Sequence, residues 1–325
     1  MKKTILLAAG AFALAVSGAH AQGNYPQRPI TLVVPFAAGG PTDVIARIVG
    51  DHMSRTLGQQ IVVENVAGAG GTTGMTRVAT ATPDGYTIGM GHMGTQGAAP
   101  ALYPNLKYDP TKDFLPIGMA AGTPIVIVAK KDFPAKDLKG FMDHVKANAA
   151  KLNQAHAGVG SVSHTTGVLL DSILEIKPTF VAYRGTGPAL NDLMSGQVDF
   201  MTDQIVNVAP QITGGNIKAF AIATPERSPA LPDLPTTKEA GLPGYEVSAW
   251  NALFAPKGTP KDIQMKLVDA LDKALDDETT RKRILDLGGV LPDKKGRTPE
   301  ALQKLVESEV ARWTPVLKAA GAVAQ

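Results

Sequence analysis

The chain has 325 residues, 44% of them hydrophobic, and carries 32 Lys and Arg against 29 Asp and Glu, for a net charge of +3. This length allows two domains with buried cores. The nearly balanced charge, without a dense basic cluster, argues against nucleic acid as a partner. The absence of cysteine excludes disulfides, thiolate metal sites and a cysteine nucleophile.

The first 21 residues have the composition of a secretory signal peptide. Lys2 and Lys3 precede the apolar run TILLAAGAFALAV, and Ala-His-Ala at 19–21 provides the small residues that cleavage requires. The apolar run is shorter than a membrane-spanning helix, which favours cleavage near Ala21 and Gln22 over an uncleaved anchor. An exported, nearly neutral and cysteine-free mature chain is expected in the periplasm.

The first part of the mature chain alternates predicted strands and helices. PITLVVPF (29–36) is a continuous apolar run rich in β-branched residues, which is typical of a buried parallel strand. Apolar residues then recur at helical spacing, with Thr42 and Asp43 as the expected cap. The order of strand, glycine-rich corner and helix returns at 59–81, and PDGYTIGM (83–90) predicts a turn and a third strand.

The middle of the chain starts this plan again. A strong strand is expected at 122–132, followed by a helix and by two strand–corner–helix units that begin near Asn153 and Pro178. The segments VDFMTDQ and IKAFAIAT predict two further strands, and SAWNALFAPKGTP predicts a last one after a proline-rich loop. The tail is predicted to be helical, with Thr298 capping a final helix that has Pro299 at its first position.

This order predicts an α/β protein with two lobes. Lobe 1 is expected to contain residues 22–122 and 249–325, and lobe 2 residues 123–248. If the last strand and the terminal helices return to lobe 1, the chain crosses between the lobes twice. Such a double crossing permits hinge motion around a cleft that would hold a ligand.

Three corners after predicted strands are rich in glycine and alanine: FAAGGPTD (36–43), VAGAGGTTG (66–74) and AGVGSVSH (157–164). Each opens a helix, whose first N–H groups lack partners and carry the positive end of the helix dipole. Such corners bind an anion without Arg or Lys, and their Thr and Ser hydroxyls add donors. Any one of them could be an ordinary strand-to-helix turn, but their recurrence favours a binding site.

The sequence contains no motif typical of nucleotide or metal binding. GAGGTTG departs from G-x-G-x-x-G because position 73 is Thr, and no corner contains the Gly-Lys-Ser/Thr of a P-loop. The histidines show no H-E-x-x-H or similar spacing. We therefore expect no nucleotide, no cofactor and no metal.

The segment YPQRPITLVVPFAAGGPTDVIARIVGDHMSRTLGQQIVVENVAGAGGTTG resembles the N-terminal signature of the Bug-type receptors, the periplasmic solute-binding components of tripartite tricarboxylate transporters. The likeness continues through PDGYTIGM, HAGVGSVSHTTGVLL, YRGTGPALNDLMSGQVDFM and FAPKGTP, and it covers essentially the whole mature chain. The resemblance implies a type II periplasmic binding protein fold, and we expect the protein to be a monomer. The resemblance also implies a small carboxylate, such as a di- or tricarboxylate or an aromatic acid, between two lobes. The implied partners are the membrane subunits of the transporter.

The resemblance also implies pocket positions, with Phe36 as a wall beside the first corner. The positions carried over by motif are Phe36, Gly40, Thr42, Asp43, Ala69, Gly70, Ser161, Ser163, Tyr183, Gly185 and Asp203. Asp43 is unexpected in an anion site, and helix capping or holding a water or an amine are its alternative roles. Asp203 could accept from a ligand hydroxyl or amine, or it could be a solvated loop residue.

Two further candidates come from features of this chain. One corner, GHMGTQGAAPALY (91–103), differs from the sequence that is more common in the family at this place. His92 and Thr95 are therefore expected to influence which ligand is bound, unless this loop packs only on its own lobe. Arg184 could hold a far carboxylate bidentately, or it could form a surface or inter-lobe salt bridge.

The sequence does not favour an enzyme. Ser161 or Ser163 with His164 would suggest a Ser/His hydrolase, but adjacent helical residues do not aim their side chains at each other, and G-x-S-x-G is absent. A periplasmic sensor subunit that binds the same ligand remains an alternative to a transport receptor.

Overall fold

The computed structural model describes residues 25–322, so the predicted signal peptide at 1–21 lies outside the described residues. The strands are β1 (Ile30–Val34), β2 (Ile61–Asn65), β3 (Thr87–His92), β4 (Phe114–Lys130), β5 (Asn153–His156), β6 (Thr179–Ala182), β7 (Phe200–Gln204), β8 (Ile217–Ile222) and β9 (Ser248–Pro256). The longer helices are α1 (Pro41–Leu57), α2 (Thr72–Ala79), α4 (Leu138–Asn148), α5 (Val162–Leu174), α6 (Thr186–Met194), α7 (Ile205–Thr213), α8 (Lys261–Asp276), α9 (Glu278–Asp286) and α10 (Pro299–Ala319). The short helical segments are η1 (Ala69–Gly71), η2 (Met93–Ala98), α3 (Ala99–Leu102) and η3 (Ala149–Lys151). Within residues 25–322, no helix is both long enough and apolar enough to cross a membrane.

The strands join in the order β2-β1-β3-β9-β4-β7-β5-β6, with β8 paired to β4. β1, β2 and β3 are parallel, and so are β5, β6 and β7, so the α/β prediction is confirmed. β9 runs antiparallel to β3 and β4, and β4 runs antiparallel to β7 and β8. β4 and β9 are antiparallel because β4 leads the chain from the first lobe into the second and β9 leads it back.

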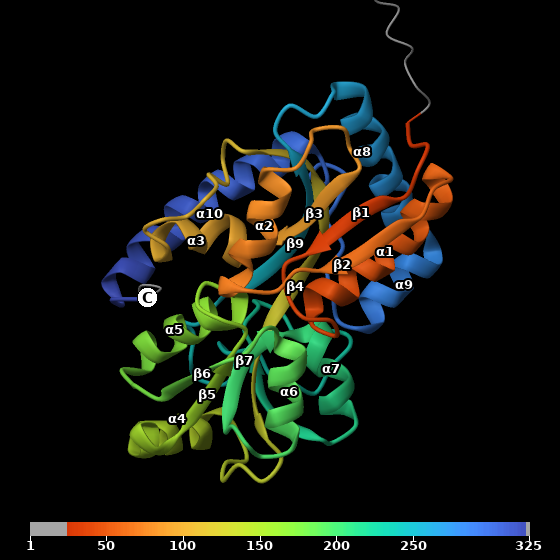
Figure 1. Cartoon of the computed structure of the whole chain (residues 1–325). Helices are drawn as coiled ribbons and strands as arrows, with labels where there is room; N and C mark the ends of the chain where they lie inside the picture. Colours follow the sequence, from red (N-terminus) through yellow and green to blue (C-terminus); the bar gives the residue numbers. More distant parts are fainter. Residues whose placement is uncertain (1–24, 323–325) are drawn as a thin grey trace, which may run out of the picture.

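β4 belongs to both lobes, which Figure 1 shows one above the other. The upper lobe contains β1, β2, β3, β9 and the start of β4, and the lower lobe contains β5 to β8 and the end of β4. Residues Phe114–Pro124 of β4 pair with β9, whereas Ile125–Lys130 pair with β7 and β8. The sequence predicted only the part from 122 onward. Pro116 and Gly118 obscure the start of the strand, and the pairing with β9 accommodates them by a shift of register there.

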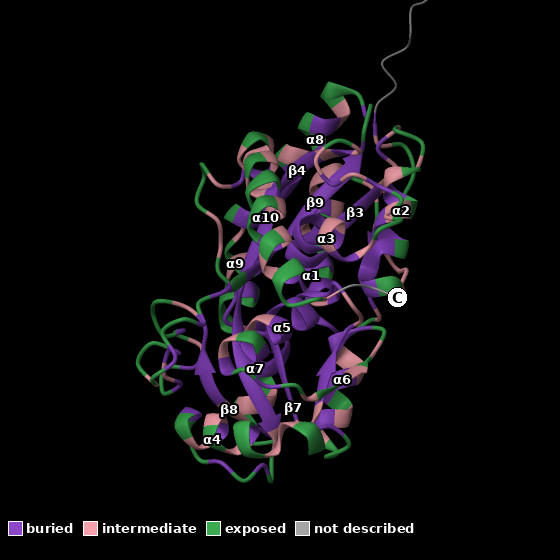
Figure 2. Cartoon of the chain, turned by 90° about the vertical axis from the view of Figure 1, so that its left-hand side faces the viewer, coloured by how far each residue is buried: buried purple, intermediate pink, exposed green. Residues whose placement is uncertain are grey.

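Alternate residues of the central strands face two separate cores. Val126 and Val128 of β4 join one cluster of buried apolar side chains, while Ile125 and Ile127 join the other. This alternation follows from the two-residue period of a strand. Helices α1, α6, α7, α8 and α9 contribute to the first cluster, and α2, α3, α4, α5 and α10 contribute to the second. Figure 2 shows the resulting layers, with buried strands inside and helices whose outer sides are exposed.

Among the longer helices, α7 was not predicted from the sequence, and α9 was covered only by the general prediction of a helical tail. α7 contains Pro210, a residue that ordinarily argues against a helix interior. α9 is short and polar, with only Thr280 and Ile284 buried, so its apolar periodicity is weak. Both helices are stabilised by packing against the rest of the fold rather than by a strong local pattern. The predicted capping of α10 by Thr298 is confirmed, because its hydroxyl accepts from the N–H of Ala301 at 3.1 Å.

Candidate functional site

A small pocket lies where the two lobes meet, and its empty volume is about 270 Å³. Side chains and backbone from both lobes line it. The lining residues are Phe36, Gly40, Pro41, Thr42, His92, Ala157, Ser161, Val162, Ser163, Thr186 and Gln204. Six of the residues predicted from the sequence are therefore brought together here: Phe36, Gly40, Thr42, His92, Ser161 and Ser163.

Four helices begin at this pocket. The N-cap residues of α1, α5 and α7 are Gly40, Ser161 and Gln204, and Thr186 is the first residue of α6. The first N–H groups of each helix lack partners inside the helix and carry its positive dipole end, so the pocket suits an anion. Among the described residues, no Lys or Arg lines it.

His92 stacks on Phe36, with ring centroids 4.9 Å apart and an angle of 22° between the ring planes. Its Nδ1 accepts the backbone N–H groups of Gly94 at 2.9 Å and Thr95 at 3.1 Å. An Nδ1 that accepts in this way carries no hydrogen, so the neutral ring has its N–H at Nε2 and can donate to a ligand. Burial lowers the pKa of His92 to about 4, which keeps the ring neutral at physiological pH.

The α5 corner supplies two hydroxyl groups. Ser161 Oγ accepts from the N–H of His164 at 3.2 Å, Ser163 Oγ accepts from the N–H of Ala157 at 3.0 Å, and the two oxygens are 3.3 Å apart. Because both oxygens already accept from backbone, each hydroxyl can donate its hydrogen. When one serine donates to the other, the hydrogen of the second remains available to a ligand. The Nδ1 atom of His164 accepts from the N–H of Gly160 at 3.3 Å. That nitrogen is therefore not bonded to either serine.

A second hollow, with an empty volume of about 790 Å³, lies beside the pocket and shares Ala157 with it. Its lining residues are Gly68, Ala69, Gly70, Tyr103, Ala157, Gly158, Val159, Ala182, Tyr183 and Arg184. The structure therefore places four predicted residues, Ala69, Gly70, Tyr183 and Arg184, in this neighbouring hollow rather than in the pocket. The hydroxyl of Tyr183 donates to Asp192 at 2.6 Å.

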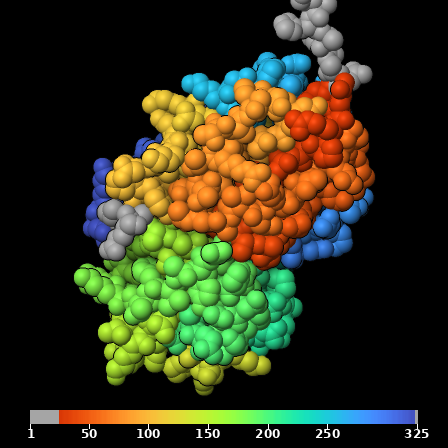
Figure 3. All heavy atoms as spheres, in the orientation of Figure 1, coloured from red at the N-terminus to blue at the C-terminus, as the bar shows by residue number. Residues whose placement is uncertain are grey.

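The two lobes touch around both hollows, and Figure 3 shows the orange upper surface resting directly on the green lower one. The N–H of Ala37 donates to the carbonyl of Arg184 at 3.0 Å, and the hydroxyl of Tyr103 donates to the carbonyl of Val159 at 2.6 Å. Gly70 is essential to this fit, because a Cβ at this position would lie 1.7 Å from the carbonyl oxygen of Val159.

Asp43 lines neither hollow. Its carboxylate accepts from the N–H of Gly39 at 3.0 Å, from Arg47 at 2.9 Å and from Asn65 at 2.9 Å. Burial acts to raise the pKa of Asp43, but these hydrogen bonds outweigh it and the pKa is lowered. The prediction that Thr42 and Asp43 cap α1 is wrong, because Gly40 is the N-cap and Pro41 takes the first helical position. Asp43 instead holds the backbone of the glycine corner in place.

The remaining predicted residues, Thr95, Gly185 and Asp203, also line neither hollow. Thr95 is buried in its own lobe, where its hydroxyl oxygen accepts from the N–H of His92 at 3.1 Å. Gly185 is the N-cap of α6 and lies against Ala37 of the other lobe. Any role of these residues in ligand binding stays a prediction.

Asp203 is fully buried, so its alternative as a solvated loop residue is wrong. Asn207 donates to one of its carboxylate oxygens. Burial raises the pKa of Asp203 to about 7, against the lowering effects of hydrogen bonds from Asn207, from the Gln204 N–H and from Thr186.

The sequence did not point to five of the lining residues: Pro41, Ala157, Val162, Thr186 and Gln204. Ala157, Val162 and Thr186 lie in or next to corners that were recognised. Gln204 was missed because α7 was not predicted, so the end of β7 showed no strand-to-helix corner. An amide side chain at the end of a strand is by itself a weak signal.

Known proteins share this fold. The family model described as "Tripartite tricarboxylate transporter family receptor" matches residues 45–322. The structure of MatC (Rpa3494) from Rhodopseudomonas palustris with bound malate is 50% identical, with a TM-score of 0.88 over 90% of this chain and 100% of that one. The periplasmic binding protein BugD is 46% identical, with a TM-score of 0.89 over 92% of this chain and 99% of that one.

A more distant relative has the same fold. R. palustris Rpa4515 with adipate is 32% identical, with a TM-score of 0.88 over 92% of this chain and 100% of that one. The likeness to BugD and to the family model confirms the Bug-type resemblance, and these structures confirm the two-lobed periplasmic binding protein fold. The chain therefore belongs to the tripartite tricarboxylate transporter receptor family.

Proposed function

We propose that this protein is a periplasmic receptor that binds a small organic carboxylate between its lobes and delivers it to the membrane subunits of a tripartite tricarboxylate transporter. The observation that carries the proposal is the convergence of four helix N-termini on a small pocket between the lobes. Malate and adipate in two related structures support a carboxylate as the ligand. The leader composition at 1–21 supports export to the periplasm.

A carboxylate would be held by directed donors rather than by a fixed cation. Backbone N–H groups of the helix ends, the hydroxyls of Ser161 and Ser163 and the Nε2 of His92 surround the same small space. Each hydrogen bond to a charged group contributes about 1.5–3 kcal/mol. Since Phe36, Gly40 and His92 belong to the upper lobe and Ser161, Ser163 to the lower, a bound anion would join the lobes.

The ligand would thereby favour closure about the two crossing strands. We propose that the moving bodies are residues 22–122 with 249–325, and residues 123–248. The exchange of β4 partners between Pro124 and Ile125 supports the first boundary, and the start of β9 at Ser248 supports the second.

A thermal-shift screen tests the receptor. The chain beginning at Gln22 is heated with mono-, di- and tricarboxylates, and each stabilising compound is recovered afterwards and analysed for chemical change. We expect at least one carboxylate to raise the melting temperature, since a ligand at 100 times its Kd stabilises by about 2.7 kcal/mol, and we expect it to be recovered intact. The proposal is wrong if no carboxylate stabilises the protein, or if the stabilising compound is consumed at enzymatic rates.

A further inference from the structure

Gln204 occupies a particular place in the pocket. It ends β7, it is the N-cap residue of α7, and only 3% of its surface is exposed. Its side chain makes no capping hydrogen bond to α7, so another set of contacts determines where the amide points.

Those contacts come from both strands that cross between the lobes. The carbonyl oxygen of the Gln204 side chain accepts from the Thr123 hydroxyl of β4 at 2.6 Å and from Asn251 Nδ2 of β9 at 3.0 Å. Asn251 Nδ2 also lies 3.3 Å from the Thr123 hydroxyl oxygen. Thr123 and Asn251 are fully buried, so this three-residue cluster is held rigidly at the junction of the lobes.

The cluster leaves the Nε2 group of Gln204 without a partner among the described residues, although Gln204 lines the pocket. With both donors of the cluster directed at Oε1, the two N–H bonds of Nε2 point away from Thr123 and Asn251. Asn251 is also the cross-strand partner of His92. The Gln204 amide of the lower lobe and the His92 ring of the upper lobe are thus connected through one β9 residue.

Four helix N-termini at one pocket favour more negative charge there than a single helix end would. A helix N-terminus behaves as roughly half a positive charge, so the α1, α5, α6 and α7 ends together are suited to two negative charges rather than one. Gln204 stands at the α7 end, and the hydroxyls of Ser161 and Ser163 stand at the α5 end.

We propose that Gln204 is a specificity-determining residue whose Nε2 group donates to the second carboxylate of a dicarboxylate ligand, and that Thr123 is the positioning residue that aims it. This inference rests on the proposed function and adds to it that the ligand is a dianion. The Gln204 side-chain amide keeps its orientation only while Thr123 of β4 and Asn251 of β9 stay next to each other where the lobes meet. Recognition of the second carboxylate therefore depends on the same two strands about which the lobes close.

Gln204→Glu is the sharpest test because it keeps the shape and the accepting oxygen while it replaces the donating group by an anionic one. The matched control is Gln197→Glu, the same change at an exposed position of the same lobe. Titration calorimetry uses malate, or whichever dicarboxylate of the screen stabilises the protein most. It also uses 2-hydroxybutyrate, which has a methyl group in place of one malate carboxylate.

We expect Gln204→Glu to weaken malate binding by about 100-fold or more, because a donor is lost and two like charges are brought together. Binding of 2-hydroxybutyrate should weaken by less than about 10-fold, since it has no second carboxylate to repel, and Gln197→Glu should leave both affinities within about twofold. The melting temperature without ligand shows whether the Glu variant is folded.

Thr123→Val is a second test, which can be used even if Gln204→Glu does not fold. It removes the bond that aims the amide but leaves Gln204 in place, so we expect malate affinity to fall by about 5- to 20-fold while 2-hydroxybutyrate binds as before. A merely structural role for Thr123 would weaken both compounds equally. The inference is wrong, and the proposed receptor function is unaffected, if the wild type binds malate and Gln204→Glu binds it with an affinity within threefold of the wild type. The same holds if Thr123→Val weakens the binding of malate and of 2-hydroxybutyrate alike. If the wild type binds no carboxylate, the proposed function itself is wrong.

Discussion

Ser161 has two roles that can be separated by experiment. Its Oγ caps α5 by accepting from the N–H of His164, and the same residue lines the pocket. Ser161→Ala should cost about 1 kcal/mol of stability for the lost cap. It should also weaken carboxylate binding by about 5- to 100-fold for the lost donor, as measured by calorimetry with malate.

Thr298→Ala is the matched control for Ser161→Ala. Thr298 caps α10 in the same way but does not line the pocket, so its loss should reduce stability by a similar amount and leave affinity unchanged. Equal affinity in Ser161→Ala and wild type would show that the α5 corner does not hold the ligand.

Asp171 is a carboxyl group that the fold keeps protonated. It is 7% exposed, and burial raises its pKa to about 8 against the lowering effect of a hydrogen bond from Gln154. The folded state therefore keeps a proton that the unfolded state releases above its ordinary pKa of about 3.9. Between these two values the Asp171 contribution to the free energy of unfolding falls as pH rises, by at most about 1.4 kcal/mol per pH unit.

Asp171→Asn should remove this dependence. Relative to wild type, the variant should gain stability steadily as pH is raised from 5 to 8, as measured by denaturant unfolding. Asp143→Asn, the same change at an exposed α4 position, is the control. Buried His92 affects stability in the opposite direction. Its pKa is about 4 in the folded state, so below about pH 6.5 the unfolded state binds a proton that the folded state does not, and the free energy of unfolding falls as pH falls. The comparison with wild type at each pH cancels that effect. Parallel pH profiles for Asp171→Asn and wild type would contradict the buried, protonated carboxyl.

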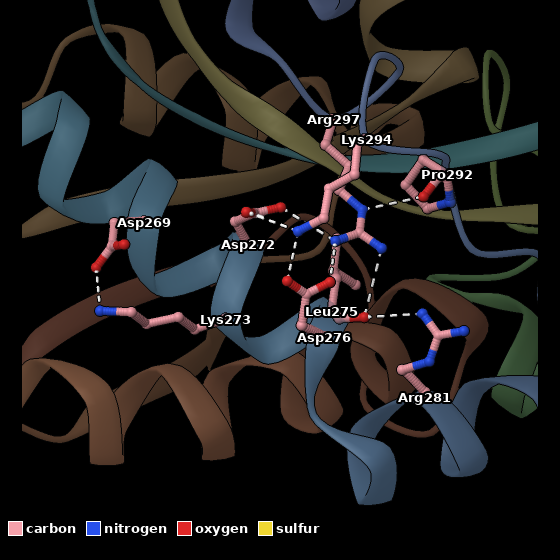
Figure 4. A network of polar contacts seen from close by, with 9 residues as sticks. All are labelled: Asp269, Asp272, Lys273, Leu275, Asp276, Arg281, Pro292, Lys294 and Arg297. Atoms are coloured by element: carbon pink, nitrogen blue, oxygen red, sulfur yellow. Dashed lines mark hydrogen bonds and ion pairs between the residues drawn. The ribbon is translucent and has the colours of Figure 1, made fainter.

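At the scale of elements, Arg297 connects α8 to the loop that precedes α10 (Figure 4). Its guanidinium donates to Asp272 at 3.0 Å, to Asp276 at 2.7 Å and to the carbonyl of Pro292 at 3.0 Å. Arg297 is only 7% exposed, whereas both carboxylates are partly exposed, and Lys294 also contacts them. One planar side chain therefore fixes two carboxylates and a loop carbonyl together.

Arg297→Ala should lower the free energy of unfolding by about 1.5–3 kcal/mol, since it removes the charge-assisted hydrogen bonds of a buried guanidinium, while Asp272 and Asp276 keep their contacts with water and Lys294. Lys273→Ala is the control, because its pair with Asp269 on the same helix is more than half exposed (59% and 58%) and should contribute less than about 1 kcal/mol. Chemical denaturation measures both. A loss no larger for Arg297→Ala than for Lys273→Ala would mean that burial adds nothing to this network.

At the scale of the whole molecule, closure depends on the close approach of η1 to the loop before α5. Gly70 has φ of +60°, and its position leaves no space for a Cβ beside the carbonyl of Val159. Gly70→Ala should therefore hold the lobes apart. We expect small-angle scattering to show compaction of the wild type at saturating malate but not of Gly70→Ala, together with at least tenfold weaker binding.

Gly58→Ala controls for the backbone cost alone. Gly58 also has positive φ, of +69°, but nothing lies within 4 Å of an added Cβ, so the variant should lose about 1 kcal/mol of stability and still close normally. Ligand-dependent compaction of Gly70→Ala equal to wild type would show that this contact does not govern closure.

The order of strands and helices in most of the chain could be predicted from the sequence, because periodicity and glycine corners are local signals. β1, β2, β3, α5 and the Thr298 cap follow directly from such patterns. The start of β4, the helix α7 and the position of α9 within the helical tail could not be, because partner strands and packing stabilise these elements against proline, glycine or a weak apolar pattern.

The amino-acid pattern was enough to show that glycine corners open helices, and to make Phe36, Gly40, Ser161 and Ser163 candidates for an anion site. Which of these corners meet in one pocket depends on the three-dimensional fold. The fold placed Ala69, Gly70, Tyr183 and Arg184 in the neighbouring hollow, and it placed Thr186 and Gln204 in the pocket. The cause is separation along the chain: Gln204 is hydrogen-bonded to Thr123 and Asn251, which lie 81 and 47 residues away from it. These long-range contacts depend on how β4 and β9 cross between the lobes, and they produce no periodic pattern of residues from which they could be predicted.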